Sequence, residues 1–213
     1  MTTTTDFEPH PEEPIPFSRL ELRAMLRAPL RMADLVLGAP RRLATNIAQE
    51  HRLPSLLVVL TVATAAFALP FGAVLGLRYW WRVAALLLGA LAICVPSLHV
   101  FARYLGVGLS WAQTLAVALA ASAVTSLFTL AFAPIVGFLR ATMTGPDSVN
   151  YGDVAVVLLF AALAVGVAQL FRLLRGGHAW RRIGRTLTLV LIPWLALCLF
   201  ITVRLAIVLG IIG

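Results

Sequence analysis

The sequence contains no lysine, and charged residues of all kinds make up only 12% of it. Water-soluble domains carry about 25% charged residues, because their surfaces have to be hydrated. A chain that is 61% hydrophobic, with a mean hydropathy of +0.94, lacks the charge for such a surface. These deficits argue against an ordinary soluble domain and predict an apolar exterior in contact with lipid.

Acidic residues are nearly absent from the apolar parts of the chain. Seven of the nine precede residue 51, and the other two, Asp147 and Asp153, lie in or beside a polar link between apolar runs. Proton-coupled and cation-coupled carriers usually place carboxylates inside the membrane, where their cost marks a function. Their absence counts against ion-coupled transport, but it leaves a hydrophobic pore or a passive conduit open.

Cysteines and catalytic motifs are equally scarce. Cys94 and Cys198 lie in separate apolar runs. They are too few for a disulfide framework or a metal site, so we interpret them as small buried or lipid-facing residues. The four histidines are dispersed, and the sequence has no HExxH, GxSxG, Walker or glycine-rich dinucleotide motif. We therefore expect no catalytic residues, no metal and no cofactor.

The charge that is present is almost all positive. All 17 basic residues are arginine, and the net charge is +8. Most of these arginines form two blocks beside apolar segments, and no basic stretch is interleaved with aromatic residues as a single-strand binder requires. The pattern favours the lipid bilayer and its anionic phospholipids as partners, and not nucleic acid.

Five apolar runs are long enough to cross a bilayer. They cover about 54–76, 83–102, 111–138, 154–171 and 186–203. The shortest runs have ~18 residues and reach ~27 Å at ~1.5 Å per residue, which is enough for a hydrocarbon core. The predicted fold is an all-α transmembrane bundle over residues 53–213. A disordered polar tail (1–16) and a basic amphipathic cytoplasmic or interfacial segment (17–52) precede it.

The arginines also predict how the bundle is oriented. With five spans, 13 arginines lie on the side of the N-terminus and three on the opposite side. The positive-inside rule then places the N-terminus in the cytoplasm and the C-terminus outside. The first apolar run begins near Leu53, too late for a cleavable signal peptide. Together with the alanine-rich, lysine-free composition, this favours a multi-pass protein of a bacterial inner (cytoplasmic) membrane.

The basic segment 17–52 is divided by prolines into three short pieces. In the first, apolar residues including Leu22 and Leu26 share one helical face, with arginines on another. In the third, Arg41 and Arg42 lie beside an apolar pair four residues apart. Such a pattern is typical of a basic amphipathic helix in the headgroup region, which we favour. A helix packed on the protein's own cytoplasmic loop would have the same pattern.

Two further arginines and one histidine are candidate lipid or partner contacts. His99 and Arg103 share a helical face near the inner end of the second run. One interpretation is that they contact a headgroup or a substrate. We prefer the other, in which His99 lies at the interface and the Arg103 side chain extends to a lipid phosphate. Arg204 reaches the outer headgroups if the last span ends near Val203, which we favour. If the helix continues, Arg204 is buried and needs a partner.

The link between the fourth and fifth runs contains Arg181, Arg182 and Arg185. We favour a role as a topological anchor, because moving arginines across the membrane costs free energy. Docking of an acidic protein partner is the alternative.

Small residues at four-residue spacing are candidates for helix packing. Gly72 and Gly76 form a GxxxG pattern, while Ala116 and Ala120 belong to one stripe of the third run and Ser122 to another. Small side chains let two helix backbones approach closely. Packing within one protomer is the preferred interpretation, and a homo-oligomer is the alternative.

Together these features resemble the Yip family, five-span membrane proteins named for their interaction with Ypt/Rab GTPases. The segment LGAPRRLATNIAQE precedes the first span, and RYLGVGLSWAQT links the second and third. The third run is rich in alanine and serine and closes at Pro134, and RLLRGGHAWRRIGRTLTLVLIP leads into a fifth run with Pro193. The resemblance covers roughly 35–200, and bacterial members of the family are similar in this order of features. The eukaryotic DLYGP-type signature is absent, so Rab binding is not implied.

The leading hypothesis is therefore a non-enzymatic, Yip-like protein that organises membrane or scaffolds a partner protein. The first alternative is a small permease-like or channel-like transport subunit. It would need a polar lining, for which the runs offer only Gln113, Gln169, His99 and scattered serine and threonine. A membrane-embedded enzyme acting on lipid is the second alternative, and it would need a convergent acid–base pair that the sequence does not show.

Overall fold

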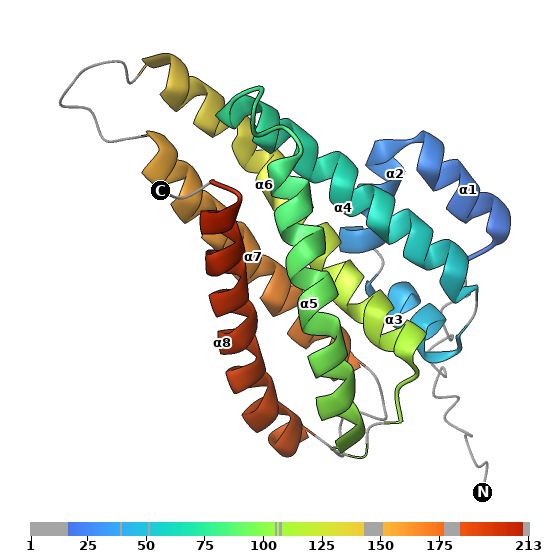
Figure 1. Ribbon diagram of the computed structural model, residues 1–213. Coiled ribbons are helices and arrows are strands. Elements are labelled where there is room, and N and C mark those ends of the chain that lie inside the picture. The colour runs from blue at the N-terminus through green and yellow to red at the C-terminus, as the bar shows by residue number, and fades with distance from the viewer. Residues whose placement is uncertain are drawn as a thin grey trace, which may run out of the picture.

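The computed structural model of the chain is a bundle of long helices with a group of short helices beside one end (Figure 1). It describes residues 17–38, 40–50, 52–104, 106, 108–142, 151–176 and 184–210. Every regular element within these ranges is a helix, which confirms the all-α prediction. The predicted tail, 1–16, lies outside the described residues.

The apolar runs form the long helices. These are α4 (Leu53–Leu75), α5 (Arg82–Tyr104), α6 (Trp111–Thr142), α7 (Tyr151–Gly176) and α8 (Gly184–Val208). Successive helices run in opposite directions along the bundle (Figure 1). In the part of the chain that is described, α4, α5 and α6 are long and apolar enough to cross a membrane. The apolar stretches Asp153–Gln169 and Trp194–Val208 are shorter. Helices α4, α5 and α6 thus have the length and composition of membrane-spanning helices, which indicates a membrane protein.

Helix α6 is the centre of the bundle. It packs along α4 on one side and α7 on another, and it also contacts α5. Ala116, Ala120 and Ala123 are completely buried in these contacts. Because alanine adds little bulk, the backbones of neighbouring helices can come close to that of α6. The stripe with Ala116 and Ala120 thus packs against other helices of the same protomer.

The buried hydroxyls of α6 are satisfied by its own backbone. Thr125, Ser126 and Thr129 each donate to a carbonyl three or four residues earlier, at 3.1, 2.9 and 2.7 Å. Such bonds satisfy polar groups where no water is present. These side chains therefore stabilise the helix internally and do not form a polar lining.

Gly72 and Gly76 shape the end of α4. A Cβ on Gly72 would lie 2.6 Å from the carbonyl oxygen of Tyr79 and 2.7 Å from that of Trp80. Only glycine lets the α4–α5 link fold back this closely. Gly76 ends the helix with φ +149°, a conformation that other residues rarely adopt. Both glycines therefore have a role inside one protomer.

The basic segment forms four short elements, α1 (Arg19–Arg27), α2 (Pro29–Ala33), the π-helical turn η1 (Asp34–Gly38) and α3 (Pro40–Ala48). Elements α1 and α2 pack on α4, η1 packs on α6, and α3 contacts α6 and α7 (Figure 1). Leu22 of the first piece and the apolar pair of the third piece, Leu43 and Ile47, were expected to face the headgroup region. All three are buried against these long helices. Much of that apolar face is thus covered by the protein itself.

Candidate functional site

A second, exposed face remains on the N-terminal elements. We call the exposed arginines and leucines of these elements the basic N-terminal surface: Leu20, Arg23, Leu26, Arg27, Leu30, Arg31, Leu37 and Arg41. Two acidic residues of the same elements, Glu21 and Asp34, are also exposed. Leu20 and Leu30 are 79% and 81% exposed, which is unusual for large apolar side chains in an otherwise packed segment. Arginines interspersed with exposed leucines fit the boundary between headgroups and acyl chains.

The start of α1 is fastened to α3. Phe17 is buried, and its backbone N–H donates to Asn46 Oδ1 at 3.3 Å. The guanidinium of Arg42 lies 4.3 Å from the centre of the Phe17 ring and 3.8 Å from the Glu21 carboxylate. Arg42, predicted as a lipid or partner contact, therefore holds the segment together. Its neighbour Arg41 is exposed.

Ser18 and Glu21 form a capping box at the N-terminus of α1. The Ser18 N–H donates to Glu21 Oε2 at 2.7 Å, and the Glu21 N–H donates to Ser18 Oγ at 3.1 Å. The bond from the Ser18 N–H lowers the pKa of the Glu21 carboxyl, with smaller contributions from the Ser18 hydroxyl and Arg42. The cap satisfies the N–H groups of Ser18 and Glu21 and gives α1 a defined starting point.

Gln113 joins the N-terminal elements to the bundle. Its Nε2 donates to the carbonyl oxygens of Ile47 and Ala48, at 3.0 and 3.2 Å, and so satisfies the C-terminal end of α3. Its Oε1 accepts from the Ser110 N–H at the start of α6. Gln113 was one of the few residues that the sequence offered for a polar lining, and the structure uses it as a connection between helices.

His99 connects α5 to the beginning of α6. Its Nδ1 lies 3.2 Å from Thr114 Oγ1, and its ring packs edge-on against Trp111 at 4.9 Å between centroids. Arg103, one turn further along α5, is exposed. The structure thus places the two members of the predicted pair in different surroundings.

The remaining predicted arginines are spread over the far parts of the chain. Arg204 is exposed, but α8 continues past it to Val208 and does not end near Val203 as expected. Arg181 and Arg182 lie outside the described residues. Arg185 belongs to α8, although its side chain lies outside the description. None of these residues is brought to the basic N-terminal surface by a described contact.

Two arginines at the end of the bundle away from the basic N-terminal surface bind helix C-termini. Arg82 Nη1 donates to the Leu209 carbonyl just after α8, and Arg140 Nη1 donates to the Val74 carbonyl of α4 at 2.7 Å. Cations are stabilised at helix C-termini, where carbonyl groups lack partners. These two arginines, on the side with few positive charges, therefore serve packing.

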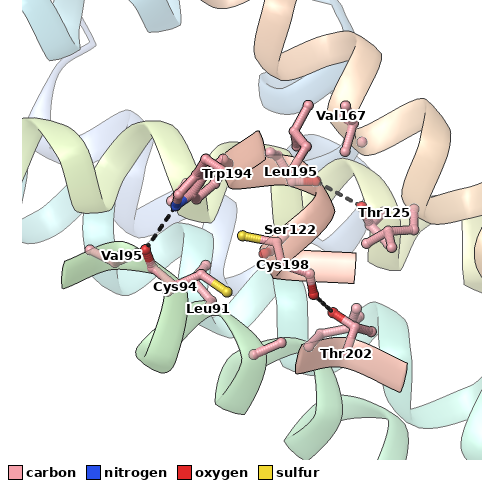
Figure 2. A pocket seen from close by; sticks show the side chains of 16 residues that line it. Leu91, Cys94, Val95, Ser122, Thr125, Val167, Trp194, Leu195, Cys198 and Thr202 are labelled. Atoms are coloured by element: carbon pink, nitrogen blue, oxygen red, sulfur yellow. Dashed lines mark hydrogen bonds between the residues drawn. The ribbon is translucent and has the colours of Figure 1, made fainter. Parts of the chain in front are cut away.

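A cavity of about 90 Å³ lies between α5, α6, α7 and α8 (Figure 2). Most of its lining is apolar, and its few hydroxyls include those of Ser122 and Thr125. Ser122, predicted as a packing residue, therefore faces open space. Cys94 and Cys198 line the same cavity from α5 and α8.

Trp194 fixes the two helices that carry the cysteines. Its indole Nε1 donates to Ser97 Oγ at 3.0 Å and to the Cys94 carbonyl at 3.3 Å. The Thr202 hydroxyl donates to the Cys198 carbonyl at 2.7 Å. Sequence reasoning missed this cluster, because nothing in two single cysteines 104 residues apart indicates that they line the same cavity. The only available signal was that each lies in an apolar run.

Comparison with known proteins gives no assignment. No family model matches the chain, and neither a curated protein nor a solved structure matches it. The resemblance to the Yip family stays a prediction from the sequence.

Proposed function

We propose that this chain is a non-enzymatic, multi-pass protein of a bacterial inner membrane, of the Yip type, that organises the membrane by holding anionic phospholipids. In this proposal α4 to α8 are five spans, with the N-terminus in the cytoplasm and the C-terminus outside. The alternating direction of the five helices and the excess of arginine on the N-terminal side support that arrangement.

One observation carries the lipid-binding part of the proposal. The N-terminal elements are held against the bundle by buried side chains such as Phe17 and Leu43, yet they keep four arginines and four leucines exposed. A rigidly held surface loses little conformational entropy on binding. Each arginine near an anionic bilayer contributes about 1 kcal/mol, and exposed leucines add burial in the acyl region.

Transport has less support. A solute path through the bundle needs polar groups that are free to contact the solute, whereas Gln113 and the buried hydroxyls of α6 bond to the protein's own carbonyls. The cavity between α5 and α8 is small and chiefly apolar. We therefore keep the permease-like function as the alternative and not the leading proposal.

The test measures stabilisation of the full-length protein by lipid. The thermal unfolding midpoint in detergent should rise more with added phosphatidylglycerol than with phosphatidylcholine, because a ligand that binds the folded state stabilises it. Replacing Arg23, Arg27 and Arg31 with glutamine should remove this difference. High salt should also weaken it, since exposed charges are screened.

The matched control removes three exposed arginines elsewhere. Arg78→Gln, Arg140→Gln and Arg172→Gln together change the net charge equally and should keep the phosphatidylglycerol effect. If both triple variants respond to lipid alike, the basic N-terminal surface is not the lipid site. Loss of a co-purifying acidic protein with no loss of the lipid effect would instead support a scaffold.

The span number has its own test. Reporter fusions at residues 1 and 213 should report cytoplasm and exterior. Both ends on one side would require an even number of spans and contradict the five-span arrangement.

A further inference from the structure

The cavity between α5, α6, α7 and α8 is bounded by packed helices on three sides. Helix α6 packs on both α5 and α7, and α8 packs on α5. In the residues that the structure describes, no contact of similar extent joins α7 to α8. Four lining side chains of these two helices are partly exposed, namely Leu163, Val167, Leu195 and Cys198. The cavity therefore opens between α7 and α8.

The main polar groups around the cavity are already bonded within the protein. The Trp194 indole donates to Ser97 Oγ and to the Cys94 carbonyl. The hydroxyls of Thr125 and Thr202 donate to carbonyls of their own helices (Figure 2). Among the described residues, no buried side-chain nitrogen or oxygen lacks a hydrogen-bond partner. A polar solute would lose its hydration here for few free partners, whereas an apolar ligand loses nothing.

The size and surroundings of the cavity fit a hydrocarbon chain. Its volume is about 90 Å³. An apolar cavity of about 150 Å³ holds benzene, so this one accommodates a short length of hydrocarbon. An empty space of this kind costs its lining dispersion contacts, which an occupant restores. Beside the opening, α7 exposes Val165, and α8 exposes Leu199 and Phe200. In a bilayer, acyl chains would lie against these side chains.

We propose that the cavity is a binding site for the end of a phospholipid acyl chain, which enters from the bilayer between α7 and α8. The chain exchanges contacts with other lipids for contacts with a lining that is already shaped, and no hydrogen bond is lost on either side. The proposal rests on the proposed arrangement of α7 and α8 as spans. It requires neither an anionic headgroup nor the basic N-terminal surface.

Trp194 can report on the occupant, because bromine atoms on an acyl chain quench the fluorescence of a nearby tryptophan. The indole lines the cavity, yet only 6% of the residue is exposed. The full-length protein, with its other four tryptophans replaced by phenylalanine, is reconstituted in phosphatidylcholine with plain or dibrominated chains. The brominated lipid should quench Trp194 strongly. Because this headgroup is neutral, the result is independent of lipid binding by the basic N-terminal surface.

Filling the cavity gives the decisive comparison. Ser122→Leu on α6 and Ala90→Leu on α5 each place a larger side chain at the lining, and each should lower the quenching of Trp194 several-fold. Ala164→Leu, at an exposed position of α7 outside the lining, is the matched control and should leave the quenching unchanged. Two filling positions on different helices allow for one variant that fails to fold. Full quenching in the folded filling variants would overturn the proposal.

A tryptophan on the outside of α8 separates failure of this site from failure of the span arrangement. Phe200 is 62% exposed, so Phe200→Trp, as the only tryptophan of the chain, should be quenched by the lipid around α8. If Phe200→Trp is quenched and Trp194 is not, the acyl-chain site alone is wrong. If neither is quenched, both the site and the placement of α8 as a span are wrong.

Discussion

Gly166 of α7 lies directly against Thr125 of α6. A Cβ on Gly166 would lie 1.9 Å from Thr125 Oγ1 and 2.8 Å from the Ala121 carbonyl oxygen. The Thr125 hydroxyl is itself held by its bond to the Ala121 carbonyl. At this contact the backbone of α7 lies so close to α6 that there is no room for a Cβ at residue 166.

We predict that Gly166→Ala destabilises the bundle by about 1–3 kcal/mol, the usual cost of added volume in a packed core. The thermal unfolding midpoint in detergent should fall. Adding Thr125→Ala should restore only part of the loss, because the Ala121 carbonyl still blocks the methyl group. Gly38→Ala is the control, since nothing lies within 4 Å of a Cβ there. Equal midpoints for both single variants would contradict the close contact.

The second prediction concerns Gly72 and the link after α4. Gly72→Ala should lower stability by about 1–3 kcal/mol, because its methyl group meets backbone oxygens that cannot rotate away. Gly108→Ala, in open space, should have little effect. Light scattering should give the same molar mass for both variants and the wild type. A change in mass confined to Gly72→Ala would favour self-association through this glycine.

The third prediction tests the fastening of α1 to α3. Removing a buried phenylalanine ring costs about 3–5 kcal/mol, so Phe17→Ala should release α1 from the bundle. Trypsin should then cleave faster after Arg23 and Arg27 while the long helices stay intact. Leu20→Ala, at an exposed position, should leave the cleavage rate unchanged. Similar rates for the two variants would show that Phe17 does not hold α1 in place.

The fourth prediction concerns acid. Because the pKa of Glu21 is lowered from 4.5 by the Ser18 N–H, its contribution is complete above pH 4.5 and is lost as the pH falls through the lower folded value. The effect is small, since the carboxylate is exposed and screened. Hydrogen exchange of the α1 amides, corrected for intrinsic rates, should show falling protection below pH 4.5. Glu21→Gln should remove this pH dependence. If the variant and the wild type lose protection in the same way below pH 4.5, the role of the Glu21 carboxylate is contradicted.

The sequence was sufficient for the long helices but not for their neighbours. Each long apolar run is a local property, and the five predicted runs coincide with α4 to α8, although α7 and α8 extend past residues 171 and 203 to Gly176 and Val208. The direction in which Leu22 and Leu43 pack depends on which surface lies nearby. An amphipathic pattern is the same against lipid and against another helix.

The candidate sites were harder to predict for the same reason. His99 and Arg103 are neighbours on a helix, but Thr114 and Trp111 of the next helix decide the surroundings of His99. Whether Cys94 and Cys198 line the same cavity depends on the register of α8 on α5, which tertiary contacts set. Apolar runs with similar composition permit many registers, so no pattern along one helix specifies that these two cysteines line one cavity.

The bond between Arg82 and the Leu209 carbonyl has a consequence for biogenesis. The two residues are 127 positions apart, and ribosomes add about 5–20 residues per second. Arg82 is thus synthesised roughly 6–25 s before its acceptor. Its guanidinium also lies over the ring of Tyr79, 4.9 Å from the centroid, so a local partner is available throughout this interval. Arrival of α8 then completes a cap that no earlier stage of insertion can form.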